Sequence, residues 1–428
     1  IQVFRENLRQ LLMQAPLSGK TVLGWDPAFR TGCKIAVVDP TGKVLDTTVV
    51  FPTAPQNRVE EAMRTIEALI RKYHVDVISL GNGTASRESE QIIADYIKKD
   101  HLPVQYVIVN EAGASVYSAS ALATEEFPNF DVGQRSATSM ARRLQDPMAE
   151  LVKIDPKSIG VGQYQHDMNQ TKLSEQLSSV VEDSVNSVGV DVNTASFALL
   201  SYVSGINKTI ARNIVAYREE KGAFTSRKEL LKVAKLGPKA YEQCAGFLRI
   251  RNGKEALDNT AVHPESYAAA KALLASMGYT EQDLQDGKNV RLAAKLQSAK
   301  ASIPALAEKL QVGAYTLEDI VQELIKPGRD PREDVPAPVL RSDVLDFDDL
   351  KPEMELQGTV RNIVDFGAFV DIGVHQDGLV HISQLADRFV KHPLDVVKVG
   401  DIVRVRVLSV DKARKKISLT MKGVDQHH

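Results

Sequence analysis

The sequence is poor in several features that mark particular classes of protein. It contains only two cysteines, Cys33 and Cys244, which lie too far apart to suggest a disulfide framework or a zinc motif. No apolar run approaches the roughly 18 to 20 residues that cross a bilayer, and no signal-peptide pattern is present. These absences predict a cytoplasmic protein without membrane contact, in which both cysteines serve packing.

The sequence also lacks a strong overall charge, since its formal net charge is −2 at pH 7. That balance hides an uneven distribution along the chain. Residues 196–252 contain eleven Lys or Arg, four Glu and no Asp, which is a net charge of +7. A segment of this kind attracts a polyanion.

The length of 428 residues is too great for a single core. We predict a multidomain fold of α/β, α and β parts: an N-terminal helical segment, an α/β domain, a connector, a tandem helix-hairpin-helix, a helical spacer, a linker and a C-terminal barrel. In that order, the expected boundaries are residues 1–19, 20–150, 151–195, 196–252, 253–326, 327–350 and 351–422. The spacer contains no convergent His, Cys or acidic set, and the linker is marked by its prolines.

Between Thr21 and Asn110 the spacing of apolar residues predicts an α/β domain. Three short β-like runs come first (TVLGWD, CKIAVVD and KVLDTTVVF), and two helix–strand pairs and a third helix follow. This βββαβαβα order is the one used by ribonuclease-H-like folds. Sites in such folds lie at the carboxyl ends of the strands.

Two carboxylates occupy such strand ends: Asp26 ends TVLGWD, and Glu111 ends VQYVIVNE. With these acids, residues 20–150 resemble the YqgF domain, a relative of the RuvC and ribonuclease H group. The resemblance makes Asp26 and Glu111 candidate catalytic residues. Two-metal cleavage of a phosphodiester needs carboxylates that bridge two divalent ions roughly 4 Å apart.

The remainder of this site looks degraded. The resemblance implies a further acid in the helix after Glu111, but QRSATSMARRLQDP presents Arg135, Ser136, Ser139 and Arg142. Asp146 and the pair His166-Asp167 are possible replacements, although Asp-Pro commonly ends a helix and a lone His-Asp is usually part of a loop. A structural role for Asp26, in which it caps the next turn, stands beside the vestigial-site interpretation. We predict no bound metal and no cofactor.

The loop GNGTASRESE, residues 81–90, lies between a strand and a helix, where backbone amides can hold a phosphate. It lacks the Gly-Lys-Ser/Thr of a P-loop, so the sequence does not predict ATP hydrolysis. A turn with the capping residues Ser86 and Ser89 is the structural interpretation. In the YqgF resemblance, the same loop borders the site.

The basic segment contains two similar units about thirty residues apart. Each has a glycine turn followed by a helix with a lysine near its start, the pattern of a tandem helix-hairpin-helix. In that motif the first amides of the second helix hold a phosphate oxygen, supported by the helix dipole and a lysine. A generic α-hairpin is the alternative for one copy. The predicted nucleic-acid contacts are Gly205, Ile206, Asn207, Lys208, Gly237, Pro238 and Lys239.

After Pro352, short alternating strands predict a five-stranded OB-fold barrel. GTVRNIVDFGAFVDIG, GLVHISQL and VLSVDKARKKISLTMK make residues 352–421 resemble the ribosomal S1 motif. Phe366, Phe369 and His381 are expected on one face, where unpaired bases would stack. A place in the barrel core is the alternative for the two phenylalanines, and their spacing across Gly367 favours exposure of at least one. The candidate phosphate contacts are Arg361, Arg404 and Lys416.

The order of these modules, with GWDPAFRTGCKIAVVD, GVGQYQHD and VGVDVNTAS, resembles the Tex family of transcription accessory proteins along essentially the whole chain. The resemblance implies that the chain is the portion after an N-terminal helical region. It also implies a protein that binds RNA in preference to DNA, favours single strands, and works with RNA polymerase or the ribosome. The alternative function is a two-metal nuclease that uses Asp26 and Glu111.

Overall fold

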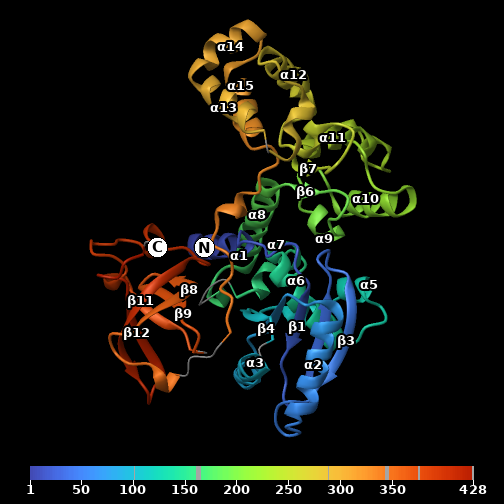
Figure 1. Ribbon diagram of the computed structural model, residues 1–428. Coiled ribbons are helices and arrows are strands. Elements are labelled where there is room, and N and C mark those ends of the chain that lie inside the picture. Colours follow the sequence, from blue (N-terminus) through green and yellow to red (C-terminus); the bar gives the residue numbers. More distant parts are fainter. Residues whose placement is uncertain (101, 161–164, 288, 343–346, 375, 427–428) are drawn as a thin grey trace. The chain divides into compact units, whose positions relative to one another are not determined.

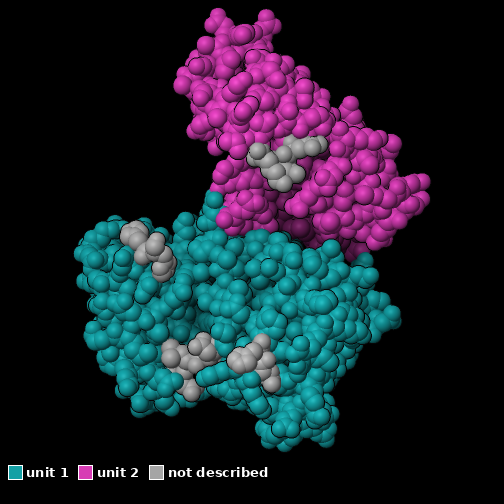
Figure 2. Space-filling model, viewed as in Figure 1, with its two compact units in different colours: residues 1–180, 334–428 teal, residues 181–333 magenta. Residues whose placement is uncertain are grey.

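The computed structural model describes residues 1–100, 102–160, 165–287, 289–342, 347–374 and 376–426 (Figure 1). The chain forms two compact units, which Figure 2 draws in separate colours. Unit 1 contains residues 1–180 and 334–428, and unit 2 contains residues 181–333. Part of GVGQYQHD (residues 161–164) and part of the predicted linker (residues 343–346) lie outside the described residues.

The α/β domain of unit 1 confirms the predicted order of strands and helices. Its sheet has the strand order β3-β2-β1-β4-β5, with an antiparallel half (β1 to β3) and a parallel half (β1, β4 and β5). Its strands are β1 (Val22–Asp26), β2 (Cys33–Val38), β3 (Val44–Val50), β4 (Val77–Gly81) and β5 (Gln105–Val109). Helix α1 (Gln2–Leu12) precedes the domain, whose helices are α2 (Val59–Tyr73), α3 (Ser86–Asp100), α4 (Ala114–Ser118), α5 (Ala121–Glu126), α6 (Val132–Gln145) and α7 (Pro147–Leu151).

Helices cover both faces of this sheet, as its continuous apolar strands predict. Side chains of β1 alternate between the two faces, so Leu23 and Trp25 enter one core with residues of α2 and α3, and Val22 enters a second core with residues of α6. Each buried Leu or Ile stabilises the fold by about 1.5–3 kcal/mol. Both cysteines are free and buried, which confirms their predicted packing role.

The C-terminal part of unit 1 is the predicted five-stranded barrel. It is closed in the order β10-β12-β11-β8-β9. Inward residues such as Val360, Val370, Val380, Val405 and Leu419 form its core. Its strands are β8 (Glu355–Val364), β9 (Gly367–Asp371), β10 (Gly378–His381), β11 (Ile402–Asp411) and β12 (Lys416–Thr420).

Unit 2 is mainly helical, with one short parallel pair of strands, β6 (Val190–Asp191) and β7 (Leu248–Arg249). Helix α8 (Gln170–Val188) begins in unit 1 and ends in unit 2. The other α-helices of unit 2 are α9 (Phe197–Leu200), α10 (Lys208–Lys221), α11 (Pro238–Cys244), α12 (Tyr267–Ser276), α13 (Val290–Ala299), α14 (Ile303–Leu310) and α15 (Ala314–Ile325). Among the described residues of the whole chain, no helix is long and apolar enough to cross a membrane.

The hairpins of unit 2 differ from the predicted pairs of regular helices. The first helix of the first hairpin, α9, has only four residues, and the corresponding segment of the second hairpin is a 3₁₀-helix, η3 (Arg227–Lys232). Successive i→i+3 hydrogen bonds, such as that from the Val233 amide to the Leu230 carbonyl, tighten both segments. Only the second helix of the first hairpin, α10, is long.

Candidate nucleic-acid interface

The acidic edge of the α/β domain is built around Asp26 and Glu111. Burial raises the pKa of both carboxyl groups, and the nearby charge of Asp26 adds to the rise at Glu111. The loop after β4 makes room for Glu111, because a Cβ at Gly83 would lie 1.6 Å from its Oε1 atom. Asn82 of the same loop accepts a hydrogen bond from the Glu111 amide at 3.1 Å. The loop therefore borders the acids, as the YqgF resemblance implies.

Helix α6 meets these acids with hydroxyl groups and cations. Ser136 hydrogen-bonds to Asp26, a partner that differs from the turn proposed in the structural interpretation of this residue. Arg135 instead donates to the carbonyls of Phe127 and Ser118. Arg142 donates to the carbonyl of Gly42 and pairs with Glu126. The hydrogen bonds and the ion pair of these two arginines therefore lead away from Asp26 and Glu111.

Arg143 is the cation that sequence inspection missed. Its Nη1 atom donates to the carbonyls of Asn110 and Ala112, the residues on either side of Glu111, at 2.8 and 2.9 Å. Burial lowers the pKa of Arg143, while Glu150 and Glu111 both oppose that shift. Arg143 follows Ser136 by seven residues and Ser139 by four, so helical spacing would have placed it on their face. The guanidinium supplies positive charge beside Glu111.

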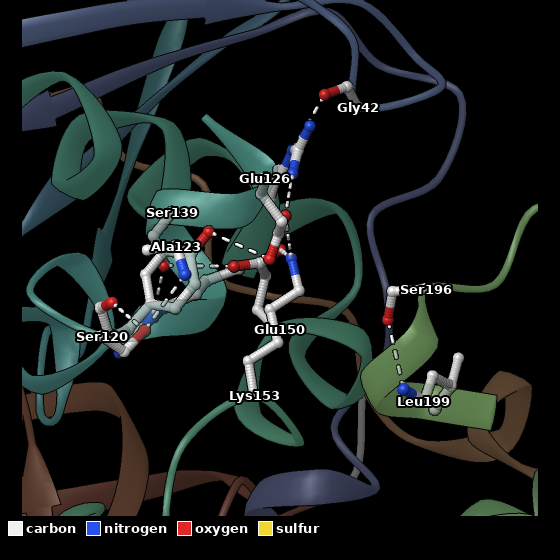
Figure 3. A network of polar contacts seen from close by, with 12 residues as sticks. Gly42, Ser120, Ala123, Glu126, Ser139, Glu150, Lys153, Ser196 and Leu199 are labelled. Atoms are coloured by element: carbon white, nitrogen blue, oxygen red, sulfur yellow. Dashed lines mark hydrogen bonds and ion pairs between the residues drawn. The ribbon is translucent and has the colours of Figure 1, made fainter. Parts of the chain in front are cut away.

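A network of polar contacts joins Ser139 of α6 to Glu150 and Lys153 (Figure 3). Ser139 donates to Glu150 at 3.2 Å, and the Lys153 ammonium lies 2.7 Å from Glu150 and 3.1 Å from Glu126. Burial by itself would raise the pKa of Glu150, but Lys153 and Arg142 together hold it below its usual range. Glu150 is thus an acid close to α6 whose charge is already compensated.

The residues at this edge do not fit a two-metal centre. Within the described ranges, no three His, Cys, Asp or Glu side chains are placed to hold a metal ion. Asp146 caps α7 by accepting a hydrogen bond from the Ala149 amide, and His166 and Asp167 lie exposed, 3.6 Å from each other. Asp26 and Glu111 face a serine and an arginine where two metal ions would need further carboxylates.

The two hairpin turns of unit 2 contain the same backbone hydrogen bond, thirty residues apart. The Ile206 amide donates to the Val203 carbonyl at 3.0 Å, and the Leu236 amide donates to the Val233 carbonyl at 3.1 Å. Ile206 and Leu236 are both buried, which anchors each turn. The tandem organisation predicted from sequence is therefore present in the backbone.

The glycines of the two turns are not equivalent, contrary to the sequence comparison that paired Gly205 with Gly237. Gly205 has φ +82° and packs against α11, where a Cβ would lie 2.6 Å from Gln243. Thirty residues later, this left-handed position is held by Lys235, at φ +66°. Gly237 is instead the N-cap of α11, the position that Asn207 holds in α10. The pattern missed this shift because Gly-Pro resembles a turn by itself.

The start of α10 is capped by Asn207. The Asn207 side chain accepts a hydrogen bond from the Ile210 amide at 2.8 Å, so that amide is occupied. The amides of Lys208 and Thr209 have no acceptor within the helix, because they belong to its first turn. Pro238 removes one such donor from α11, and Lys239 is exposed in its first turn.

Several basic residues of the +7 segment make contacts within the fold of unit 2, although Arg212 is also exposed to solvent. The Arg227 guanidinium is buried and donates to the carbonyls of Leu248 and Val262. Arg218 donates to the carbonyl of Val192, and Arg212 lies over the ring of Phe197. The charge offered to a polyanion is therefore smaller than the sequence count.

The barrel carries its aromatic residues on the outer face of β9, β10 and the turn before β9. The rings of Phe366 and Phe369 contact edge to face, with centroids 6.3 Å apart. His381 ends β10 opposite Gly367 of β9 and is exposed. Phe366 is 46% exposed, and neither ring belongs to the barrel core, which confirms the expected exposure. We call Phe366, Phe369 and His381 the aromatic face.

The three basic residues predicted to bind phosphates are spread around the barrel. Arg361 lies on β8, 3.8 Å from both Asp371 and Asp377, and Arg404 lies on β11, 3.7 Å from Glu355. Lys416 begins β12 and is exposed. Long, partly solvated ion pairs of this kind contribute roughly 0–1 kcal/mol, so they compete weakly with a phosphate.

Four family models match the chain. They are described as the Tex protein YqgF-like domain (residues 20–145), the helix-hairpin-helix motif (residues 185–249), the HHH domain (residues 255–332) and the S1 RNA binding domain (residues 349–422). The "Transcriptional accessory protein Tex" of Neisseria gonorrhoeae is 52% identical over all of this chain and 55% of its own length. The chain belongs to the Tex family.

Other Tex relatives show the same partial coverage. "Uncharacterized protein YdcI" of Bacillus subtilis is 57% identical over 98% of this chain and 58% of its own length. The human "S1 RNA-binding domain-containing protein 1" is 38% identical over 98% of this chain and 48% of its own length. This Tex chain therefore spans about half the length of these relatives. The solution structure of GSP13 from Bacillus subtilis matches 17% of this chain at a TM-score of 0.16, too low to support a fold assignment.

The matches also add to the sequence interpretation of this Tex chain. The region predicted as a helical spacer corresponds to the HHH domain model. Its helices pack through an apolar core that includes Leu273, Leu296, Leu317 and Val321. Apolar periodicity could predict the helices but not their relation to the preceding hairpins.

Proposed function

We propose that this Tex chain binds unpaired RNA, with bases stacked on the aromatic face of the barrel and backbone phosphates held by the hairpin turns. The observation that carries the proposal is the exposure of the aromatic face on a barrel of the S1 RNA binding family. Flat rings that lie outside the core can be covered by a base without disturbing the packing of the barrel. Each stacked base contributes about 1–3 kcal/mol.

The hairpins supply the second element of the proposal. The first amides of α10, which have no acceptor within the helix, and the exposed Lys208 and Lys239 suit a phosphate oxygen, which carries no sequence information. Binding through these groups releases counterions from the nucleic acid, so it weakens as salt rises. DNA shares the same backbone charge and is a second ligand for the hairpins.

The α/β domain serves this proposal as a scaffold. Its acids, Asp26 and Glu111, lie beside Ser136 and Arg143, and this set does not suit two divalent ions. A nuclease function would require a further carboxylate at the same edge. We therefore set the nuclease alternative below RNA binding.

The cellular setting belongs to the proposal as well. A relative that is 52% identical bears the name "Transcriptional accessory protein Tex", which supports a role in transcription. RNA polymerase is therefore the first partner that we propose, and the ribosome is the second. A cytoplasmic location agrees with that role. Because the chain spans about half of its relatives, partners of the whole protein lie outside what these residues support.

RNA binding is tested by measuring the affinity of single-stranded RNA across a range of salt concentrations. We expect Phe369→Ala with His381→Ala to weaken binding at every salt concentration, and Lys208→Ala with Lys239→Ala to flatten the salt dependence by a slope of about 1 to 2. Unchanged affinity in both double variants would contradict the proposed surfaces.

The nuclease alternative is tested by incubating the pure protein with labelled single-stranded and junction substrates in magnesium or manganese. We expect no cleavage. Cleavage that Asp26→Asn abolishes would establish the alternative, because a contaminating nuclease would not respond to that substitution.

A further inference from the structure

We propose that a cleft beside the aromatic face recognises a guanine base of the bound RNA strand. This inference rests on the proposed RNA binding by the barrel. The cleft lies within unit 1 and encloses about 420 Å³. Its lining includes Phe369, Arg361, Asn362 and Asp377 of the barrel, Arg341 of the segment before it, and Asn82 of the α/β domain.

The charges of the cleft favour a neutral polar ligand over a phosphate. Glu90, Asp371 and Asp377 contribute carboxylates, and Arg341 and Arg361 contribute guanidinium groups. A phosphate would meet more negative than positive groups, which opposes its entry. A nucleobase is uncharged and offers both hydrogen-bond donors and acceptors, so both kinds of side chain can satisfy it.

Two of the three carboxylates are committed to the fold. Glu90 accepts a hydrogen bond from the Tyr106 hydroxyl at 2.9 Å, and Asp371 accepts one from the Gly373 amide at 2.8 Å. Arg341 lies between them, 3.3 Å from Asp371 and 4.0 Å from Glu90. Asp377 has no hydrogen bond with any described residue and is therefore the carboxylate best able to accept one from a ligand.

Arg361 and Asp377 form a donor–acceptor pair that is open to a base. The Arg361 Nε atom lies 3.8 Å from the Asp377 Oδ2 atom, which is too long for a hydrogen bond. Burial raises the pKa of Asp377 against the opposing charge of Arg361, so donors brought by a ligand would stabilise its carboxylate. Both side chains retain groups that a base edge can use.

Guanine matches this pair better than the other bases. Its N1–H and N2–H groups are adjacent donors that one carboxylate accepts together, and its O6 and N7 atoms are adjacent acceptors that arginine reads bidentately. Adenine, cytosine and uracil lack two adjacent donors. Phe369 lines the cleft and belongs to the aromatic face, so the base that stacks on it can turn this edge toward Asp377.

The volume also agrees with a single base. Small-molecule pockets commonly enclose about 300–1,000 Å³, and this cleft lies at the lower end of that range. The cleft therefore suits one purine of an unpaired strand. Its neighbours along the strand would remain on Phe366 and His381.

The test measures binding of the 428-residue chain to four RNAs: a twelve-residue oligouridylate and the same strand with guanosine, inosine or adenosine at its centre. Inosine lacks the N2 amino group of guanosine, so it tests this donor without any substitution in the protein. We expect the guanosine strand to bind on the order of ten-fold more tightly than the oligouridylate, and inosine to lose most of that gain. Asp377→Asn should remove the preference for guanosine, whereas the matched control Asp395→Asn, an exposed carboxylate elsewhere on the barrel, should retain it.

The outcomes separate the two proposals. Equal binding of all four strands, with Asp377→Asn like the unaltered chain, would overturn the guanine cleft and leave RNA binding intact. A preference for adenosine equal to that for guanosine would also overturn it, because stacking on Phe369 alone would then explain the affinity. Absence of binding to every strand would overturn RNA binding itself.

Discussion

The acidic edge of the α/β domain and the aromatic face of the barrel both follow a sequence signature for nucleic acid. They differ in how their side chains are placed, because those of the acidic edge have partners within the fold and the aromatic face lies outside the core. At the acidic edge, Asp26 is bonded to Ser136, and Arg143 brings positive charge beside Glu111. At the aromatic face, Phe366 lies 46% exposed and outside the core. Side chains that a fold has paired internally are poor candidates for ligand contact, while exposed rings remain available.

The largest expected effect comes from removing the positive charge of Arg143 at the acidic edge. We expect Arg143→Met to lower the free energy of unfolding by about 3–5 kcal/mol, because it leaves the carbonyls of Asn110 and Ala112 without their donor and Glu111 without its neighbouring positive charge. Arg142→Met is the control, since Arg142 is partly solvated and pairs with Glu126 at 3.3 Å, and its loss should cost about 1 kcal/mol. Urea unfolding followed by circular dichroism measures both. Equal losses would show that Arg143 has no special role at this edge.

The aromatic face is tested by truncating its most exposed ring. We expect Phe366→Ala to weaken single-stranded RNA binding by about 1–3 kcal/mol, because one stacked base loses its platform. The control is Phe389→Ala, which removes a ring that is 87% exposed on the same barrel but outside the aromatic face. Fluorescence anisotropy with labelled RNA measures the affinity. If both substitutions weaken binding alike, general apolar contact and not the aromatic face is responsible.

The pH dependence of stability sharpens the contrast at Asp26. Its pKa is raised by burial, so the folded state holds this proton to higher pH than the unfolded state does. The resulting contribution to stability is complete below the pKa of the unfolded chain and is lost as the pH rises through the folded pKa. Asp26→Asn cannot ionise, so its stability relative to the unaltered chain should be higher at pH 7 than at pH 4. Urea midpoints at the two pH values test this, and an identical difference at both would contradict the raised pKa.

The smallest expected effect concerns the second hairpin turn, where Lys235 holds the left-handed position that Gly205 holds in the first. Lys235→Gly should relieve backbone strain and increase stability by about 0.5–1 kcal/mol, while it removes a charge and weakens nucleic-acid binding. Asn252→Gly is the control, because Asn252 also has a positive φ in unit 2 but carries no charge. It should give a smaller stability gain, because asparagine tolerates the left-handed region better than lysine, and no loss of binding, as measured by thermal unfolding and a filter-binding assay. Unchanged binding by Lys235→Gly would mean that this lysine does not contact the ligand.

Much of the architecture could be predicted because it depends on local patterns. The apolar run in TVLGWD and the helical spacing in VEEAMRTIEALIRKY predicted β1 and α2, and glycine-punctuated strands predicted the barrel. The domain boundaries and the roles of the individual site residues stay predictions. The binding experiments described above test the roles of the site residues.

The sequence by itself determined which elements form and in what order, because apolar spacing and turn residues act over short stretches of chain. It also determined the membership of the Tex family. Only the tertiary structure decided that Arg143 lies beside Glu111, that Lys235 and not Gly237 is equivalent to Gly205, and that Arg361 and Asp377 share a cleft with Asn82. These relations join residues far apart in the chain or depend on backbone dihedral angles, and neither is encoded in a local pattern of residue types.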